Sequence, residues 1–165
     1  MVSTQVLSLV LIVAITLVDV ALCEGVFAYF GWERIEVYHG AMWGLFIPLV
    51  AVAIGFHLYI TRNPALWNPH YRLTAFSPRA FTELVLFVAS TCLRAYLGHI
   101  DILYYWFQGK PVPDVLPWLN ETLIGDVARW LGYSEVARDA LFKSVMLAEL
   151  VNVLLFWVAL KVGGD

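Results

Sequence analysis

The chain has 165 residues, of which 61% are hydrophobic and only 14% are charged, and its mean hydropathy is +0.77. Soluble globular domains carry about 25% charged residues, so this composition excludes an ordinary water-exposed surface and indicates one that faces lipid. The net charge of −3 excludes the basic footprint of a nucleic-acid-binding protein. The length fits a single domain, residues 1–165.

Four apolar segments are long enough to cross a bilayer, for which a helix needs about 20 apolar residues. They cover residues 5–30, 41–61, 79–107 and 135–161. The first segment follows no Lys or Arg and exceeds the apolar core of a signal peptide, so we expect it to be a retained spanning helix. Pro48 is expected to kink the second segment, and Ser134 fits an N-cap of the fourth. The predicted fold is an all-α, polytopic membrane bundle of four transmembrane helices.

The connection between the third and fourth segments has a helical pattern of its own. Apolar residues recur on one face and polar residues on the other: Leu116, Leu119, Leu123, Val127, Trp130 and Leu131 against Asn120, Glu121, Asp126 and Arg129. This pattern is typical of an amphipathic helix that lies on the membrane surface. A lid over the mouth of the bundle is the alternative.

The charges of the connections predict the orientation in the membrane. The connection over residues 62–78 contains Arg62 and Arg72 but no acidic residue. The positive-inside rule places this connection in the cytoplasm, and both termini with it. Tyr and Trp residues near the predicted membrane edges fit aromatic belts. We therefore expect a multi-pass protein of the cell membrane, with the lipid bilayer as its main partner.

Ionisable residues within the predicted spans are the candidates for function. Each costs at least about 2.5–3.5 kcal/mol at the centre of a spanning helix and usually faces the bundle interior. In the third segment, Glu83, Ser90, Arg94 and Asp101 fall on one line and form a polar stripe. The predicted site combines residues from the first, third and fourth segments, namely Asp19, Arg94, His99, Asp101 and Glu149.

Asp19, Arg94 and Glu149 are expected at similar depth, which predicts an intramembrane ion-pair network. Arg94 can neutralise only one carboxylate, so the other must be protonated, bind a cation or accept hydrogen bonds from neutral donors. A carboxyl group in such surroundings is suited to acid–base chemistry. His99 and Asp101 are expected above this network, toward the outside. The alternative is a static ion pair that fixes the register of the helices.

The cysteines and histidines do not form a known metal motif. Cys23 and Cys92 lie in apolar segments without ligand spacing. His39 and His99, together with Glu24, could supply metal ligands on the outer side, but the sequence contains no HExxH motif and no cysteine cluster. The sequence therefore identifies no cofactor.

The predicted function is a membrane-embedded enzyme or binding unit that acts by acid–base chemistry on an apolar lipid, isoprenoid or quinone-like substrate. Asp19, Asp101 and Glu149 would exchange protons, Arg94 would stabilise negative charge and His99 would be a second proton carrier. The substrate would enter from the outer half, under the amphipathic segment. Two alternatives are a non-catalytic subunit of a larger membrane complex and a proton- or cation-coupled transporter. The transporter would need a homo-oligomer, because four helices enclose little pore.

Overall fold

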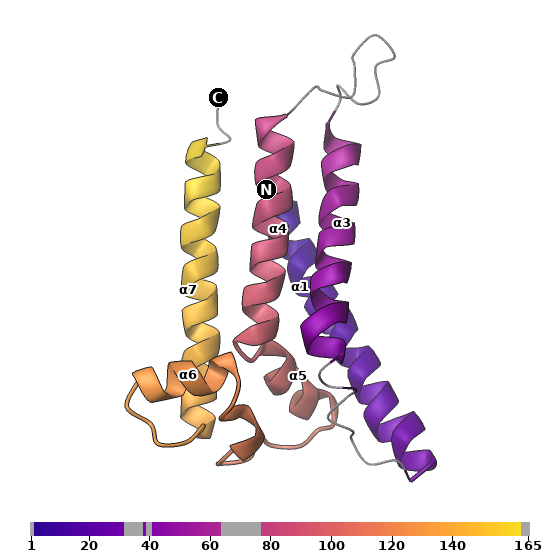
Figure 1. Cartoon of the computed structure of the whole chain (residues 1–165), viewed down its shortest axis with the longest axis vertical. Coiled ribbons are helices and arrows are strands. Elements are labelled where there is room, and N and C mark those ends of the chain that lie inside the picture. The colour runs from indigo at the N-terminus through magenta and orange to yellow at the C-terminus, as the bar shows by residue number, and fades with distance from the viewer. Residues whose placement is uncertain (1, 32–37, 39–40, 64–76, 163–165) are drawn as a thin grey trace.

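The computed structural model describes residues 2–31, 38, 41–63 and 77–162, and these residues form a helical bundle (Figure 1). The first helix, α1 (Val2–Val20), continues into a π-helical segment, η1 (Ala21–Phe27). The remaining elements are η2 (Met42–Phe46), α3 (Ile47–Arg62), α4 (Pro78–Tyr96), α5 (His99–Phe107), the 3₁₀ turn η4 (Pro117–Leu119), α6 (Leu123–Trp130) and α7 (Arg138–Val162).

Three of the described helices are long and apolar enough to cross a membrane, and the pair α4–α5 makes a fourth if it counts as one span. They run over Val2–Phe27, Met42–Arg62 and Arg138–Val162. The all-helical fold predicted from the sequence is therefore confirmed for the described residues, with three helices, or four with the bent pair, of the length and composition of a membrane span.

Helix α4 lies at the centre of the bundle, where it packs against α1, α3 and α7. The beginning of α1 and the end of α7 lie toward the end of the bundle at which α3 ends and α4 begins (Figure 1). Helix α5 packs against α1 at the opposite end, and α6 crosses α7 there (Figure 1). The loops and short helices that follow α4 are thus gathered at one end.

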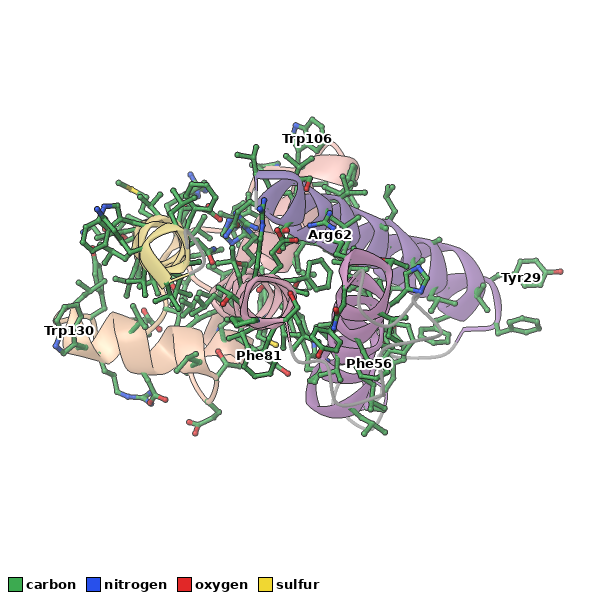
Figure 2. All side chains as sticks on the ribbon, turned by 90° about the horizontal axis from the view of Figure 1, so that it is seen from above. Tyr29, Phe56, Arg62, Phe81, Trp106 and Trp130 are labelled. Atoms are coloured by element: carbon green, nitrogen blue, oxygen red, sulfur yellow. The ribbon has the colours of Figure 1, made fainter. Side chains whose placement is uncertain are left out.

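The outside of the bundle is apolar. Large side chains point away from the helices at its rim, while Arg62 lies between the helices (Figure 2); the labelled rim residues are Tyr29, Phe56, Phe81, Trp106 and Trp130. Small residues occupy the interfaces, since α7 buries every fourth residue of one face: Ala140, Ser144, Ala148 and Asn152. Small residues let neighbouring backbones approach closely, which is the usual way for helices to pack in membranes.

Pro48 lies at the beginning of α3, directly after the wider turn of η2. Proline lacks the N–H group that would bond to the carbonyl four residues earlier. A π-helical turn is one of the helix irregularities that accompany such a missing hydrogen bond. A π-helical turn thus precedes Pro48, while the kink predicted there stays a prediction.

The third predicted span, residues 79–107, is broken rather than continuous. Helices α4 and α5 meet at an angle of 61°. Gly98 between them has a φ of +104°, which residues with side chains rarely adopt, and this conformation ends α4. A Cβ at Gly98 would lie 2.3 Å from Leu141 Cδ1 of α7. Glycine therefore provides both the turn and the close approach of α7.

The fourth helix begins at Arg138, not at residue 135 as predicted from the sequence. The preceding residues are held by a distant segment, because Leu116 N–H donates to the carbonyl of Val136 (2.8 Å) and Arg138 N–H donates to that of Asp114 (2.9 Å). Ser134 precedes this paired segment and does not cap α7. A non-local backbone pairing thus delays the start of the helix.

The predicted amphipathic helix is shorter than its sequence pattern, because only Leu123–Trp130 form α6. Gly125 lies so close to the preceding turn that a Cβ would come within 2.1 Å of the carbonyl oxygen of Asn120. Beneath this segment lies a small core formed by Leu116, Leu119, Ile124, Ala128, Val136, Ala140 and Leu141. We call residues 114–137, which cover this end of the bundle, the cap.

Candidate functional site

Arg94 is buried within the bundle and binds Glu149 of α7 through two parallel hydrogen bonds. Its Nε donates to Oε1 at 2.7 Å and its Nη2 donates to Oε2 at 3.0 Å. The remaining nitrogen, Nη1, donates to Ser8 Oγ at 2.9 Å and to the carbonyl of Gln5 at 3.3 Å. Two-point binding of a carboxylate by arginine is among the stronger polar contacts in proteins. Arg94 thereby joins α1, α4 and α7.

His99 belongs to the same cluster. Its Nε2 lies 2.9 Å from Glu149 Oε1. The side chain of Glu149 is 40% exposed, whereas that of Arg94 is only 4% exposed. The sequence predicts His99 above the network, and the structure instead brings it into contact with the carboxylate. We call Arg94, His99 and Glu149 the charged cluster.

Neutral polar side chains extend the charged cluster along α1 and α4. Thr91 Oγ1 donates to Ser8 Oγ at 3.1 Å, and Gln5 Nε2 donates to Ser90 Oγ at 2.9 Å. The polar stripe of α4 therefore faces a polar stripe on α1, and the two pair with each other.

Asp19 does not contribute to this cluster, and the predicted network of Asp19 with Arg94 is wrong. Arg94 reaches α1 at Ser8, which is eleven residues from Asp19, or about 16 Å along a helix. Asp19 accepts hydrogen bonds from Tyr38 (2.9 Å) and Cys23 (3.5 Å). The two helices are offset: α1 starts beside the second turn of α4, which sets Asp19 beyond the level of Arg94.

The offset between the helices is fixed by a second polar contact, which is half-buried. Arg62 at the end of α3 forms an ion pair with Glu83 of α4. The same guanidinium donates to Thr4 Oγ1 at 3.2 Å and to Ser3 Oγ at 3.1 Å. The sequence marks Arg62 only as part of a basic connection. The structure shows that Arg62 ties the ends of three helices together.

A cavity of about 760 Å³ lies at the cap end of the bundle. It is bordered by α1, η2, the α4–α5 junction, η4 and the beginning of α6. Asp19 and Asp101 both line this cavity, whereas Arg94, His99 and Glu149 do not. The five predicted site residues therefore form two groups rather than one.

An apolar layer lies between the polar stripe of α1 and the cavity. Its buried members are Ile12, Ile15, Ile47, Ala95 and Ile100. Along α1, Ile12 and Ile15 lie between Ser8 of the polar stripe and Asp19 at the cavity. Ala95 and Ile100 belong to this layer and also line the cavity. The layer is thus the floor of the cavity on the side of the charged cluster.

Aromatic side chains form much of the cavity wall, and three of them, Trp43, Tyr104 and Tyr105, lie at membrane edges predicted from the sequence. The lining includes Trp43, Tyr96, Tyr104, Tyr105 and Trp118. Tyr96 OH donates to the carbonyl of Trp43 at 2.5 Å, and Tyr104 OH donates to Glu24 Oε1 at 2.7 Å. A signal for this role exists in the sequence, because Tyr104 and Tyr105 follow Asp101 at helical spacing.

Within the residues that the structure describes, no group of three His, Cys, Asp or Glu side chains could hold a metal ion. His39, the predicted neighbour of His99 in a metal site, lies outside the described residues. Comparison with protein-family models, curated proteins and solved structures finds no match for the chain.

Proposed function

We propose that the chain is a membrane-embedded binding unit or enzyme that takes an apolar small molecule into the cavity and holds its polar end at Asp19 and Asp101. The observation that carries this proposal is the cavity itself, with mostly apolar walls and two carboxyl groups. Its volume of about 760 Å³ is within the range of small-molecule sites, about 300–1,000 Å³.

A location in the bilayer is supported by the outer surface of the bundle. Three helices, or four with the bent pair, are long and apolar enough to cross a membrane, and their outward side chains are large and apolar. The arginines near residues 62–79 favour a cytoplasmic position for that end and for both termini. The cavity would then lie in the outer half of the membrane.

The route into the cavity supports an apolar ligand that arrives from the bilayer. Trp118 and Leu123 of the cap line the cavity, yet they are 55% and 48% exposed. The cavity therefore reaches the outside between cap residues that are themselves apolar. A molecule dissolved in lipid could enter there without crossing a polar surface.

The two carboxyl groups supply the chemistry. Asp101 lies in the first turn of α5, where the helix dipole stabilises negative charge. A carboxyl group beside the polar end of a bound molecule can accept or donate a proton. The charged cluster lies outside the cavity, so we assign it a positioning role: it fixes α4, α5 and α7 and thereby the place of Asp101.

Filling the cavity tests this proposal. Gly44 lines the cavity and a Cβ there would meet nothing within 4 Å, so Gly44→Trp is expected to fill space without disturbing the fold. Gly25 is equally open but does not line the cavity, which makes Gly25→Trp the matched control. Radiolabelled dodecanol would be measured on the full chain in lipid nanodiscs, with empty nanodiscs subtracted. We expect at least tenfold weaker binding to Gly44→Trp only. Equal binding to both variants would refute the proposal.

A further inference from the structure

We infer that the bundle binds water beside the charged cluster, between α1, α4 and α7, and that this water exchanges with the water outside. The site is separate from the cavity and does not depend on the molecule that the cavity takes. It is carried by buried amide atoms without hydrogen-bond partners next to the half-exposed carboxylate of Glu149.

The amide groups lie one helical turn from the charged cluster, on the side away from the cap. Asn152 follows Glu149 on α7 by three residues, and Ser90 precedes Arg94 on α4 by four. Because Arg94 binds Glu149 and the two helices run in opposite directions (Figure 1), both steps lead to the same level. Gln5 of α1 reaches this level too, since its Nε2 donates to Ser90 Oγ at 2.9 Å.

These amides contain three buried atoms without a hydrogen-bond partner among the described residues. They are the acceptors Gln5 Oε1 and Asn152 Oδ1 and the donor Asn152 Nδ2. The side chain of Asn152 lies near the carboxylate of Glu149, but without a hydrogen bond of normal geometry. Buried polar atoms in proteins nearly always bond to another protein group or to bound water. The level of Asn152 therefore requires a further hydrogen-bonding partner.

That partner must be small. Asn152 is only 2% exposed, and both Ser90 and Ala148 beside it are fully buried, so a side chain of another protein cannot reach it. A water molecule is small enough, and a buried one typically makes two to four hydrogen bonds. The oxygens of Gln5, Asn152 and Glu149 can accept from water, and Asn152 Nδ2 can donate to it. The site thus offers both kinds of partner that water needs.

Glu149 connects this site with the outside of the bundle. Its side chain is 40% exposed, although Leu150 and Val153 on the outer face of α7 are large and apolar. In the proposed membrane location, a carboxylate that met acyl chains alone would be costly. Water that hydrates Glu149 on its open side lowers this cost. Hydrogen exchange between the site and bulk water is the expected consequence.

Hydrogen exchange into heavy water tests the inference on the full chain in lipid nanodiscs, labelled with nitrogen-15 at asparagine. The variant Asn152→Leu assigns the signals, because it lacks those of residue 152. We expect the side-chain amide hydrogens of Asn152 to exchange at least about a hundredfold faster than its backbone N–H, which lies within α7. Equal rates would overturn the inference, since both hydrogens would then exchange only when the bundle opens.

Thermal unfolding of the same variant gives a second test, whose sign differs between a hydrated and a dry site. Leucine is close to asparagine in size, so Asn152→Leu displaces the water and leaves Gln5 Oε1 without a partner. We expect a lower unfolding temperature. In a dry site the change would remove two unpartnered atoms and raise the unfolding temperature, which would overturn the inference. Val153→Leu is the matched control, since Val153 is the next residue of α7 and points outward, and it should change neither exchange nor unfolding.

Discussion

The charged cluster and the cavity both contain acidic side chains inside the bundle, but they use them differently. In the charged cluster, the carboxylate of Glu149 is bound by the buried Arg94 and by His99. At the cavity, Asp19 and Asp101 line a volume of about 760 Å³ that reaches the outside beside the cap. This difference is the basis on which we assign the first region to the packing of the helices and propose the second as a ligand site.

The largest expected effect is that of Arg94→Met, which leaves Glu149 and the polar stripe of α1 without their cation. Breaking a buried pair by removing one partner costs about 3–5 kcal/mol. The free energy of unfolding in detergent would measure the loss. Arg129→Met removes an arginine from the exposed pair with Asp126 and should cost less than about 1 kcal/mol.

A double variant sharpens this prediction. Arg94→Met combined with Glu149→Met leaves no unpaired charge in the bundle, so it should be more stable than Arg94→Met alone. If Arg94→Met unfolds like the unmodified chain, the charged cluster does not stabilise the bundle and the contrast between the two regions is lost.

An intermediate effect is expected for Gly98→Ala, at the bend that separates the two regions. A side chain at this position meets both a disfavoured φ and Leu141 of α7, so we expect a loss of about 1–3 kcal/mol. Gly109→Ala is the control, because Gly109 also has a positive φ but open space around it. Equal losses for the two variants would show that the approach of α7 at Gly98 is unimportant.

A smaller effect is expected for Asn120→Ala in the cap. Asn120 Oδ1 accepts a hydrogen bond from Val136 N–H at 2.8 Å, and its loss should cost about 0.5–1.5 kcal/mol. Hydrogen exchange at Val136 should accelerate, while exchange in the middle of α4 stays unchanged. Unchanged exchange at Val136 would contradict the role of Asn120 in holding the cap closed.

The smallest effect on stability is expected for Asp101→Asn. Asn has nearly the same shape as Asp and keeps one acceptor oxygen, and the side chain is only partly buried. Its free energy of unfolding should change by less than about 1 kcal/mol, far less than for Arg94→Met. Thermal unfolding of the two variants side by side provides the measurement. A loss as large as that of Arg94→Met would mean that Asp101 serves the fold rather than a ligand.

Features that depend on one helix at a time were predictable from the sequence. The long apolar segments indicate the helices, and the high cost of a buried Arg94 predicts a carboxylate partner, which is Glu149. The bend at Gly98 was missed because a single glycine within an apolar run gives no sign of a left-handed conformation. The start of α7 was missed because it depends on backbone pairing with Asp114 and Leu116, which are distant in sequence.

The placing of Asp19 shows a different limit. Counting residues from the ends of apolar segments assumes that all helices begin at one level. The contacts of Arg62 with Thr4 and Glu83 instead place the beginning of α1 beside the second turn of α4. Asp19 therefore lies further toward the cap end than Arg94. The cavity was not predictable either, since its aromatic walls come from four separate segments, and Trp43, Tyr104 and Tyr105 among them also fit a membrane edge.

The bond between Arg94 and Glu149 has a consequence for biosynthesis. The two residues are 55 positions apart, and Glu149 lies in α7, which leaves the ribosome after α4. Until α7 is made, Arg94 lacks its carboxylate and α4 carries an uncompensated positive charge. In the proposed membrane location, a nascent chain that stops before α7 would expose that charge to lipid. Such a truncated product should be retained by the insertion machinery or degraded.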